Sequence, residues 1–185
     1  MNRRQILLVL ASQTGMLWLT VNGFAAQAGK IVSSTSTPGK IRVYSAEQGD
    51  FILVDKVQKS AAEWKQLLTS EQYHVLREEG TERAFTGDLL KNKEHGVYRC
   101  AACENDLYLS ESKFDSGTGW PSYYKAIAKE NVLIREDRSF FTTRNELICS
   151  RCESHLGHVF DDGPPPTGKR HCINSISLKF KKLDQ

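Results

Sequence analysis

Five cysteines divide into two chemical groups. Cys100 with Cys103 and Cys149 with Cys152 form two C-x-x-C pairs separated by 45 residues, whereas Cys172 stands apart. Each pair can offer two thiolates to one tetrahedral Zn²⁺, and a site closed by four sulfurs stabilises a fold but leaves no open position for a substrate. Two disulfides are the alternative, with three possible connectivities in an oxidising compartment. Both readings leave Cys172 free to react.

Cys172 lies in the run R-H-C-I-N-S, which supplies cationic and hydrogen-bonding neighbours. Because the thiolate is the reactive form of cysteine, we expect Arg170 to lower the pKa of Cys172 and activate it; the alternative is a solvated charge at a strand end. His155 and His158 follow the second cysteine pair closely. They could transfer protons near neutral pH, or they could be core histidines or additional metal ligands.

Composition favours a folded protein of one domain with an extension. The 185 residues are 39% hydrophobic and 25% charged, which is typical of a globular chain. The formal net charge is +3, and two of the positive charges, Arg3 and Arg4, lie in the first 28 residues, which leaves +1 for the remainder. A nearly neutral body gives no electrostatic reason to expect nucleic-acid binding.

Residues 1–28 have the organisation of a signal peptide. A basic start with Arg3 and Arg4 precedes a largely apolar stretch over residues 6–24, and residues 26–28 form an A-x-A cleavage site. The paired arginines match the twin-arginine export consensus loosely. We therefore expect export to the periplasm or an equivalent lumen, with an uncleaved membrane anchor as the alternative.

The capping, glycine and alternation patterns in the rest of the chain predict a mainly β fold with short helices near its start. Residues 29–54, rich in Ser, Thr and small residues, are expected to form a linker or extended arm. Ser60 and Thr69 each begin a capping-box pattern, which predicts a helix over residues 61–68 and a second helix that ends at a left-handed Gly80. Regularly spaced glycines follow, and alternating apolar residues predict a strand over residues 173–180.

Several longer segments resemble a known family. They are residues 60–64, 73–82, 85–87, 114–122 (F-D-S-G-T-G-W-P-S), 155–160 (H-L-G-H-V-F) and 170–180, with the two C-x-x-C pairs, Asp162 and Gly163. In this order they cover about residues 55 to 181 and resemble the B-type methionine sulfoxide reductases. The cysteine pairs alone are generic, but their combination with G-W-P-S, H-L-G-H-V-F and R-H-C-I-N-S is highly specific.

This resemblance implies a catalytic domain over residues 55–181 with two small antiparallel sheets in a tent-like arrangement, short N-terminal helices and a structural zinc site. It implies reduction of the R epimer of methionine sulfoxide, free or in oxidised proteins, through a cysteine sulfenic acid, in the repair of oxidative damage. The family roles map onto Cys172 as nucleophile, His155, His158 and Asn174 as proton-handling and orienting groups, Trp120 and Arg170 as substrate-binding residues, and Cys100, Cys103, Cys149 and Cys152 as zinc ligands.

The chemistry explains these residue types independently. A sulfoxide carries a polar oxygen and an apolar methyl group on one sulfur, so a selective pocket needs proton donors on one side and an aromatic surface on the other. Attack by the Cys172 thiolate requires protonation of the oxygen, for which His158 is the expected donor. Trp120 can supply the aromatic surface, although an ordinary core tryptophan is the alternative.

The chain departs from many relatives at Thr118, where the family often has a second redox cysteine. With four cysteines on zinc, regeneration then requires an external thiol, such as a thioredoxin-like protein, glutaredoxin or a small thiol. His171 and Asp161 also replace residues more usual in the family, and we expect both at the pocket rim. A monomer is expected.

Two other functions remain compatible with parts of the pattern. One is a zinc-knuckle binding module that holds a peptide with Trp120 and contains an inert Cys172. The other is a disulfide reductase with a working C-x-x-C pair. Thiol reactivity separates the first from an enzyme, and zinc bound to both pairs would exclude the second.

Overall fold

The computed structural model describes residues 39–137 and 144–183, and antiparallel strands make up most of this part of the chain. The described residues belong to one unit spanning Thr35–Gln185. The predicted signal peptide, residues 1–28, lies outside the described residues. Within the described ranges, no helix has the length and apolar character needed to cross a membrane. The prediction of a mainly β fold with antiparallel sheets and short N-terminal helices is confirmed.

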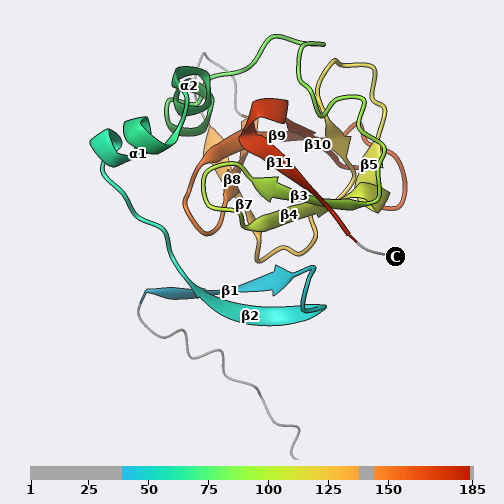
Figure 1. The fold of residues 1–185 in the computed structure, drawn as a ribbon. Coiled ribbons are helices and arrows are strands. Elements are labelled where there is room, and N and C mark those ends of the chain that lie inside the picture. Colours follow the sequence, from blue (N-terminus) through green and yellow to red (C-terminus); the bar gives the residue numbers. More distant parts are fainter. Residues whose placement is uncertain (1–38, 138–143, 184–185) are drawn as a thin grey trace, which may run out of the picture. The chain divides into compact units, whose positions relative to one another are not determined.

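Two sheets carry most of the strands (Figure 1). The larger has the order β5-β6-β10-β9-β8-β7, and the smaller has the order β11-β3-β4. The strands of the larger sheet are β5 (Lys113–Phe114), β6 (Ser122–Tyr123), β7 (Val132–Asp137), β8 (Arg144–Cys149), β9 (His155–Phe160) and β10 (Arg170–Ile173). Those of the smaller sheet are β3 (Gly96–Cys100), β4 (Asp106–Leu109) and β11 (Leu178–Lys182).

A separate β-hairpin replaces part of the expected arm. β1 (Lys40–Ser45) and β2 (Asp50–Asp55) pair antiparallel in a sheet of their own. Asn131 fixes the hairpin to the main body, because its side chain accepts from the Tyr44 N–H at 2.8 Å and donates to the Tyr44 carbonyl at 2.8 Å. Residues 40–55 are therefore not an extended arm. Their ordering depends on Asn131, which is far away in sequence.

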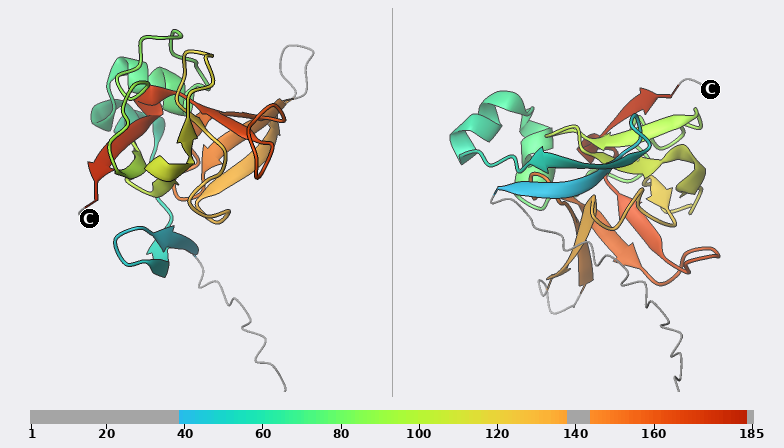
Figure 2. Two further views of the ribbon diagram at one scale, coloured as in Figure 1. Left: turned by 90° about the vertical axis from the view of Figure 1, so that its right-hand side faces the viewer. Right: turned by 90° about the horizontal axis from the view of Figure 1, so that it is seen from below.

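Both predicted helices are present and lie together at one end of the sheets (Figures 1 and 2). α1 (Ala61–Leu67) begins at Ser60 and α2 (Ser70–Arg77) begins at Thr69, each with a complete capping box. The expected left-handed residue after α2 is Glu79, with φ 58°, and not Gly80. Gly80 is required for space instead, since a Cβ at this position would meet the His74 ring.

The single strand expected over residues 173–180 is broken. β10 ends at Ile173, a 3₁₀ turn, η2 (Ser175–Ser177), follows, and β11 continues in the other sheet. The Glu82 carboxylate causes the break, because it accepts hydrogen bonds from the N–H groups of Ser175 at 2.6 Å and Ile176 at 2.9 Å. These N–H groups therefore turn toward Glu82 and do not continue a strand ladder. A second short turn, η1 (Ser110–Ser112), precedes β5.

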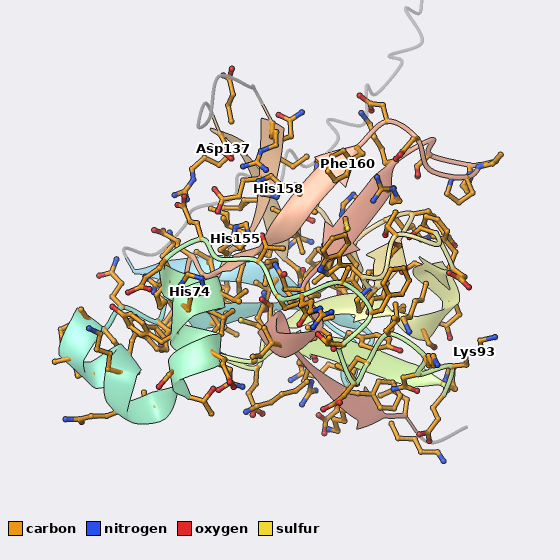
Figure 3. The ribbon with its side chains drawn as sticks, turned by 90° about the horizontal axis from the view of Figure 1, so that it is seen from above. His74, Lys93, Asp137, His155, His158 and Phe160 are labelled. Carbon is orange, nitrogen blue, oxygen red and sulfur yellow. The ribbon has the colours of Figure 1, made fainter. Side chains whose placement is uncertain are left out.

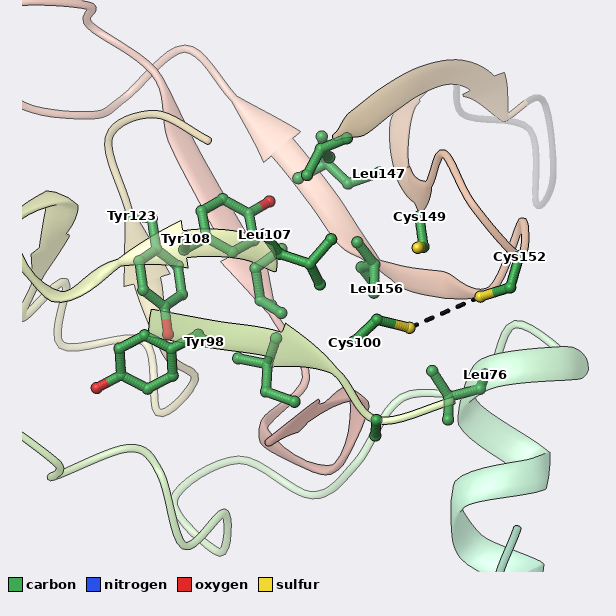
Figure 4. Packing of buried hydrophobic residues seen from close by; sticks show 14 of the residues in the cluster. Leu76, Tyr98, Cys100, Leu107, Tyr108, Tyr123, Leu147, Cys149, Cys152 and Leu156 are labelled. Atoms are coloured by element: carbon green, nitrogen blue, oxygen red, sulfur yellow. Dashed lines mark hydrogen bonds between the residues drawn. The ribbon is translucent and has the colours of Figure 1, made fainter. Parts of the chain in front are cut away.

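The apolar core links the two main sheets and the helices (Figure 4). Three tyrosines form its centre: the ring of Tyr108 stacks on that of Tyr123 with centroids 4.3 Å apart, and Tyr98 meets Tyr123 edge-on at 5.2 Å. Leu76 brings α2 into the same cluster. Cys100, Cys149 and Cys152 also belong to this core, so it stabilises the cysteine turns directly.

Candidate functional site

The two C-x-x-C pairs meet in one buried cluster. The sulfurs of Cys100, Cys103, Cys149 and Cys152 all lie within 4.8 Å of one another, and every cysteine of the chain is a free thiol. Close contacts join the two pairs, with 3.7 Å between the sulfurs of Cys100 and Cys152 and 3.5 Å between those of Cys103 and Cys149. Figure 4 shows the sulfurs of Cys100, Cys149 and Cys152 turned toward one another. The predicted ligand set is therefore assembled.

The two cysteine turns have the same backbone geometry. In each turn the residue after the second cysteine adopts a left-handed conformation, Glu104 with φ 60° and Glu153 with φ 58°. The N–H of that glutamate donates to the carbonyl of the first cysteine, Cys100 or Cys149, at 2.8 Å in both turns. A left-handed residue with a side chain is uncommon. Its repetition indicates that both turns are shaped to present two sulfurs to one centre.

The cluster can hold a metal ion. The sulfurs of Cys103, Cys149 and Cys152 raise the pKa of Cys100 well above its ordinary value. Four thiolates in this volume would repel one another strongly, and a bound cation removes that repulsion. Buried cysteine sulfurs with short mutual distances are the donor set that a soft or borderline metal prefers.

Cys172 lies outside this cluster, in the middle of the larger sheet. On β10 it pairs with His158 of β9 on one side and with Ser122 of β6 on the other. β9 can approach so closely because of Gly157, where an added Cβ would collide with the Cys172 carbonyl oxygen. Cys172 is half-buried, so its sulfur is partly accessible. The strand register therefore places Cys172 beside one of the two predicted histidines.

Arg170 contacts Cys172 but does not make it acidic. Burial raises the pKa of the Cys172 thiol above its usual value, and the Arg170 guanidinium lowers it only in part. Arg170 is itself paired with the Asp162 carboxylate through two hydrogen bonds of 2.9 Å, and it lies 4.4 Å from the centre of the Phe160 ring. Because burial outweighs the Arg170 guanidinium, which is also paired with Asp162, the expected net lowering of the Cys172 pKa is wrong.

A hydroxyl group is the second donor to Cys172. The Thr118 side chain hydrogen-bonds the Cys172 sulfur and lowers the pKa of that thiol. Thr118 is in turn 2.8 Å from the Ser116 hydroxyl, which is 2.7 Å from the hydroxyl of Ser122. In the sequence, Thr118 is notable only for the cysteine that it replaces. Its role as a hydrogen-bond donor to Cys172 was not predicted.

His158 faces the same region from β9. Its Nε2 atom lies 3.3 Å from the Asp137 carboxylate at the end of β7 (Figure 3). Burial lowers the pKa of His158, and the hydrogen bond that its imidazole donates to the Asp137 carboxylate opposes this shift. A histidine with these two influences can hold or release a proton close to neutral pH. Its position beside Cys172 agrees with the predicted role in proton transfer.

His155 lies deeper and has a different environment. Its Nδ1 atom is 2.7 Å from the Glu146 carboxylate, and both side chains are almost completely buried. Arg135 donates to the other oxygen of Glu146 at 2.7 Å. The rings of His155 and His158 are 5.3 Å apart between centroids. His155 can therefore orient His158 by packing, and Glu146, which the sequence analysis missed, fixes the ring of His155.

Trp120 and Asn174 are held by one residue of the preceding loop, Glu82. The backbone carbonyl of Glu82 accepts from the Trp120 indole N–H at 3.1 Å, and its N–H donates to the Asn174 side chain at 3.0 Å. Asn174 also donates from its amide to the Leu156 carbonyl at 3.1 Å. Glu82 was not singled out from the sequence, because its partners lie 38 and 92 residues away.

These groups surround one cavity of about 180 Å³, which we call the cysteine pocket. Its walls include Trp120, Gly157, His158, Phe160, Cys172 and Asn174. Two predicted residues, His155 and Arg170, do not line it and act through His158 and Cys172, which they contact. The pocket therefore combines a nucleophile, a titratable imidazole and an aromatic wall.

Comparisons with known proteins agree with this arrangement. The SelR domain family matches residues 68–182. A protein of Methanosarcina barkeri named peptide methionine sulfoxide reductase MsrB is 63% identical over 129 residues, covering 70% of this chain and 91% of that protein. The protein of the same name from Methanosarcina mazei is 59% identical over 128 residues, covering 69% and 91%.

Two more distant similarities were found. The chloroplastic peptide methionine sulfoxide reductase B1 of Arabidopsis thaliana is 50% identical over 154 residues, covering 83% of this chain and 73% of that protein. The solved Mis18 "Yippee-like" domain covers 50% of this chain and all of its own with a TM-score of 0.41 and 19% identity, which carries no structural argument. From the family match and the three sequence relatives, the chain belongs to the SelR domain family of B-type methionine sulfoxide reductases.

Proposed function

We propose that this protein reduces the R epimer of methionine sulfoxide to methionine, in proteins or as the free amino acid, and so repairs oxidative damage. The observation that carries the proposal is the pairing of Cys172 with His158 across neighbouring strands, where both line the cysteine pocket with Trp120. The pocket thereby holds a nucleophile, a proton donor and an aromatic surface for the methyl group. These are the three groups that a sulfoxide requires.

The reaction begins when the Cys172 thiolate attacks the sulfoxide sulfur. The sulfoxide oxygen cannot leave as oxide, so the His158 imidazolium protonates it as the new sulfur bond forms. The oxygen then passes to Cys172, and methionine departs as a thioether. The substrate sulfur gains two electrons, the Cys172 sulfur loses two, and the enzyme is left with a cysteine sulfenic acid.

Regeneration uses a thiol that the chain does not supply. All five cysteines are in the described ranges, and the four other than Cys172 form the four-cysteine cluster that can hold a metal. Two equivalents of an external thiol reduce the sulfenic acid to thiol, with release of water and formation of the reductant's disulfide. A thioredoxin-like protein, glutaredoxin or a small thiol fits this requirement.

Zinc is the proposed occupant of the four-cysteine cluster. A tetrahedron with Zn–S bonds of about 2.3 Å has edges of about 3.8 Å, and two sulfur separations between the cysteine pairs are 3.5 and 3.7 Å. Four protein ligands would complete the coordination of the metal. Zinc would therefore hold the β3 and β8 turns together and take no part in the reaction.

Export is proposed for the N-terminal segment. The support is the order of Arg3 and Arg4, the apolar residues 6–24 and the A-x-A site at residues 26–28. Mass spectrometry of protein isolated from cells should find a mature chain that begins at residue 29 in the periplasm or an equivalent lumen. A full-length chain in the membrane fraction would support the uncleaved anchor instead.

A single-turnover experiment tests the reaction. Native protein is mixed with the R or the S sulfoxide of methionine without any reductant, and methionine is counted per enzyme. We expect about one equivalent from the R epimer, much less from the S epimer, and none from Cys172→Ser. Equal reduction of both epimers, or an active Cys172→Ser variant, would contradict the proposal.

A further inference from the structure

A second cavity adjoins the cysteine pocket. Its volume is about 720 Å³, and we call it the lysine groove after Lys91, Lys93 and Lys113, which line it with Phe85, Asp115 and Trp120. Trp120 lines both the groove and the cysteine pocket. A polypeptide whose oxidised methionine enters the cysteine pocket must continue past its mouth, and the groove begins at the shared wall. A chain that leaves the cysteine pocket past Trp120 would therefore enter the groove.

Phe85 lines the groove in a backbone conformation that is unfavourable for a bulky residue. Its φ is 67°, in the left-handed region, and its side chain is exposed, with a relative accessibility of 69%. The Phe85 N–H donates to the Gly119 carbonyl at 2.8 Å, and a Cβ at Gly119 would press on the Phe85 ring. A bulky residue stays in this region only where the surroundings enforce it, often at a ligand contact. The exposed ring therefore offers an apolar contact for a bound chain.

The groove also has an excess of positive charge. Lys91 and Lys93 are exposed, and within the part of the chain that the structure describes neither ammonium forms an ion pair with a carboxylate. Figure 3 shows Lys93 extending outward from the ribbon. Lys113 is held by the carbonyls of Leu89, Leu90 and Asn92 at 2.6 to 2.9 Å, so it fixes the segment that carries the other two. Asp115 is the only acidic residue among the lining residues.

From these observations we propose that the lysine groove binds the polypeptide segment flanking an oxidised methionine and favours segments with Asp or Glu beside it. Phe85 supplies the apolar contact, and Lys91 with Lys93 supplies the charge selection. This inference rests on the proposed function and extends it to the choice among protein substrates. A free amino acid fills the cysteine pocket alone and does not reach the groove, so its reduction is independent of the two lysines.

Matched peptides test the groove. Three peptides carry a central methionine R-sulfoxide flanked on both sides by Asp, Ser or Lys, and N-acetyl methionine sulfoxide amide serves as the small substrate. We expect the kcat/KM ratio of the Asp to the Lys peptide to be about fivefold in the native protein, since exposed charge pairs contribute little each. In Lys91→Glu with Lys93→Glu the ratio should invert. The control, Lys59→Glu with Lys129→Glu, makes the same charge change at exposed residues outside the groove and the cysteine pocket.

The outcomes separate this inference from the proposed function. A native protein that reduces neither the small substrate nor any of the peptides overturns the proposed function, and this inference with it. A native protein that reduces the small substrate but treats the Asp and Lys peptides alike overturns only the groove. The same holds if the groove and control variants change the peptide ratio equally. A change in the KM of a thioredoxin-like reductant, with the peptide ratio intact, would also overturn it by assigning the groove to the reductant.

Discussion

The protein uses cysteine in two regions with opposite surroundings. In the four-cysteine cluster the sulfurs lie within 4.8 Å of one another, in turns packed against the apolar core. Cys172 instead lies between two strands of the larger sheet, and its sulfur meets the Thr118 hydroxyl, the Arg170 guanidinium and the cysteine pocket. The residue type is the same in both regions, so reactivity depends on what each sulfur contacts.

This difference assigns each region one task. Sulfurs that share a metal lose their availability for exchange, and their bonds to it become part of the free energy of folding. Cys172 remains available because the sheet keeps it out of the cluster. Burial raises the pKa of its thiol, so the Arg170 and Thr118 side chains must stabilise the thiolate. The four-cysteine cluster should therefore determine the stability of the fold, and the environment of Cys172 should determine the rate of the reaction.

The strongest test separates the two tasks with two serine substitutions, one in each region. Cys149→Ser should release the metal and unfold the protein, since structural zinc can contribute about 10 kcal/mol or more, as much as the whole stability of many domains. Cys172→Ser should keep both the metal and the Tm but lose turnover by at least about 10³-fold. Metal analysis, thermal unfolding and single-turnover assays give the three values. A folded and active Cys149→Ser variant would show that the fold does not depend on the four-cysteine cluster.

The next test concerns the proton donor. His158→Gln should slow the first turnover by about 10²- to 10⁴-fold, the usual contribution of a positioned acid or base, with little change in metal content or Tm. His95→Gln is the matched control, because His95 is exposed and forms a surface ion pair with Glu111. A rate within tenfold of the native value would show that another group donates the proton.

The pH profile of the first turnover sharpens the comparison further. The pKa of His158 is lowered and that of Cys172 is raised, so the thiolate–imidazolium form is a minor species. Between the two pKa values the gain in thiolate offsets the loss of imidazolium, and the rate should be constant. It should fall about tenfold per pH unit below the His158 pKa, which burial lowers, and above the Cys172 pKa, which burial raises. Iodoacetamide labelling, which reports the thiolate alone, should inflect at a higher pH than for a free model thiol, whose pKa is about 8.5; an inflection at a lower pH than for that thiol would contradict the raised pKa.

The sequence could predict those parts of the molecule that depend on local signals. Both helices begin at the predicted residues because a capping box needs only residues three apart, Ser60 with Glu63 and Thr69 with Gln72. The four-cysteine cluster was predictable for a similar reason, since each turn brings its own two sulfurs together. The position of Cys172 beside His158 required the family resemblance, because strand register is not visible in short segments.

Interactions between distant residues explain the errors. The carboxylate of Glu82 turns the chain at Ser175 and Ile176, 93 and 94 residues further on, so the expected long strand is divided between two sheets. The hairpin over residues 40–55 depends likewise on Asn131. The error at Arg170 has a different cause, because burial raises the pKa of the Cys172 thiol more than the Arg170 guanidinium lowers it. No local pattern in the sequence reveals Glu82 as the partner of Ser175, Asn131 as the partner of Tyr44, or the burial of Cys172.

The smallest expected effect isolates the hydroxyl donor to Cys172. Thr118→Val removes the donor and should raise the pKa of the thiol and slow the first turnover by about three- to tenfold, which corresponds to the net contribution of about 0.5–1.5 kcal/mol that is typical of one intramolecular hydrogen bond. Thr118→Ser keeps the hydroxyl and should restore most of the rate, which separates hydrogen bonding from packing. The Cys172 pKa is measured by pH-dependent alkylation and compared with the rate. If Thr118→Val changes neither, Arg170 alone stabilises the thiolate, and the Arg170–Asp162 pair leaves more of the cation available to Cys172 than its geometry indicates.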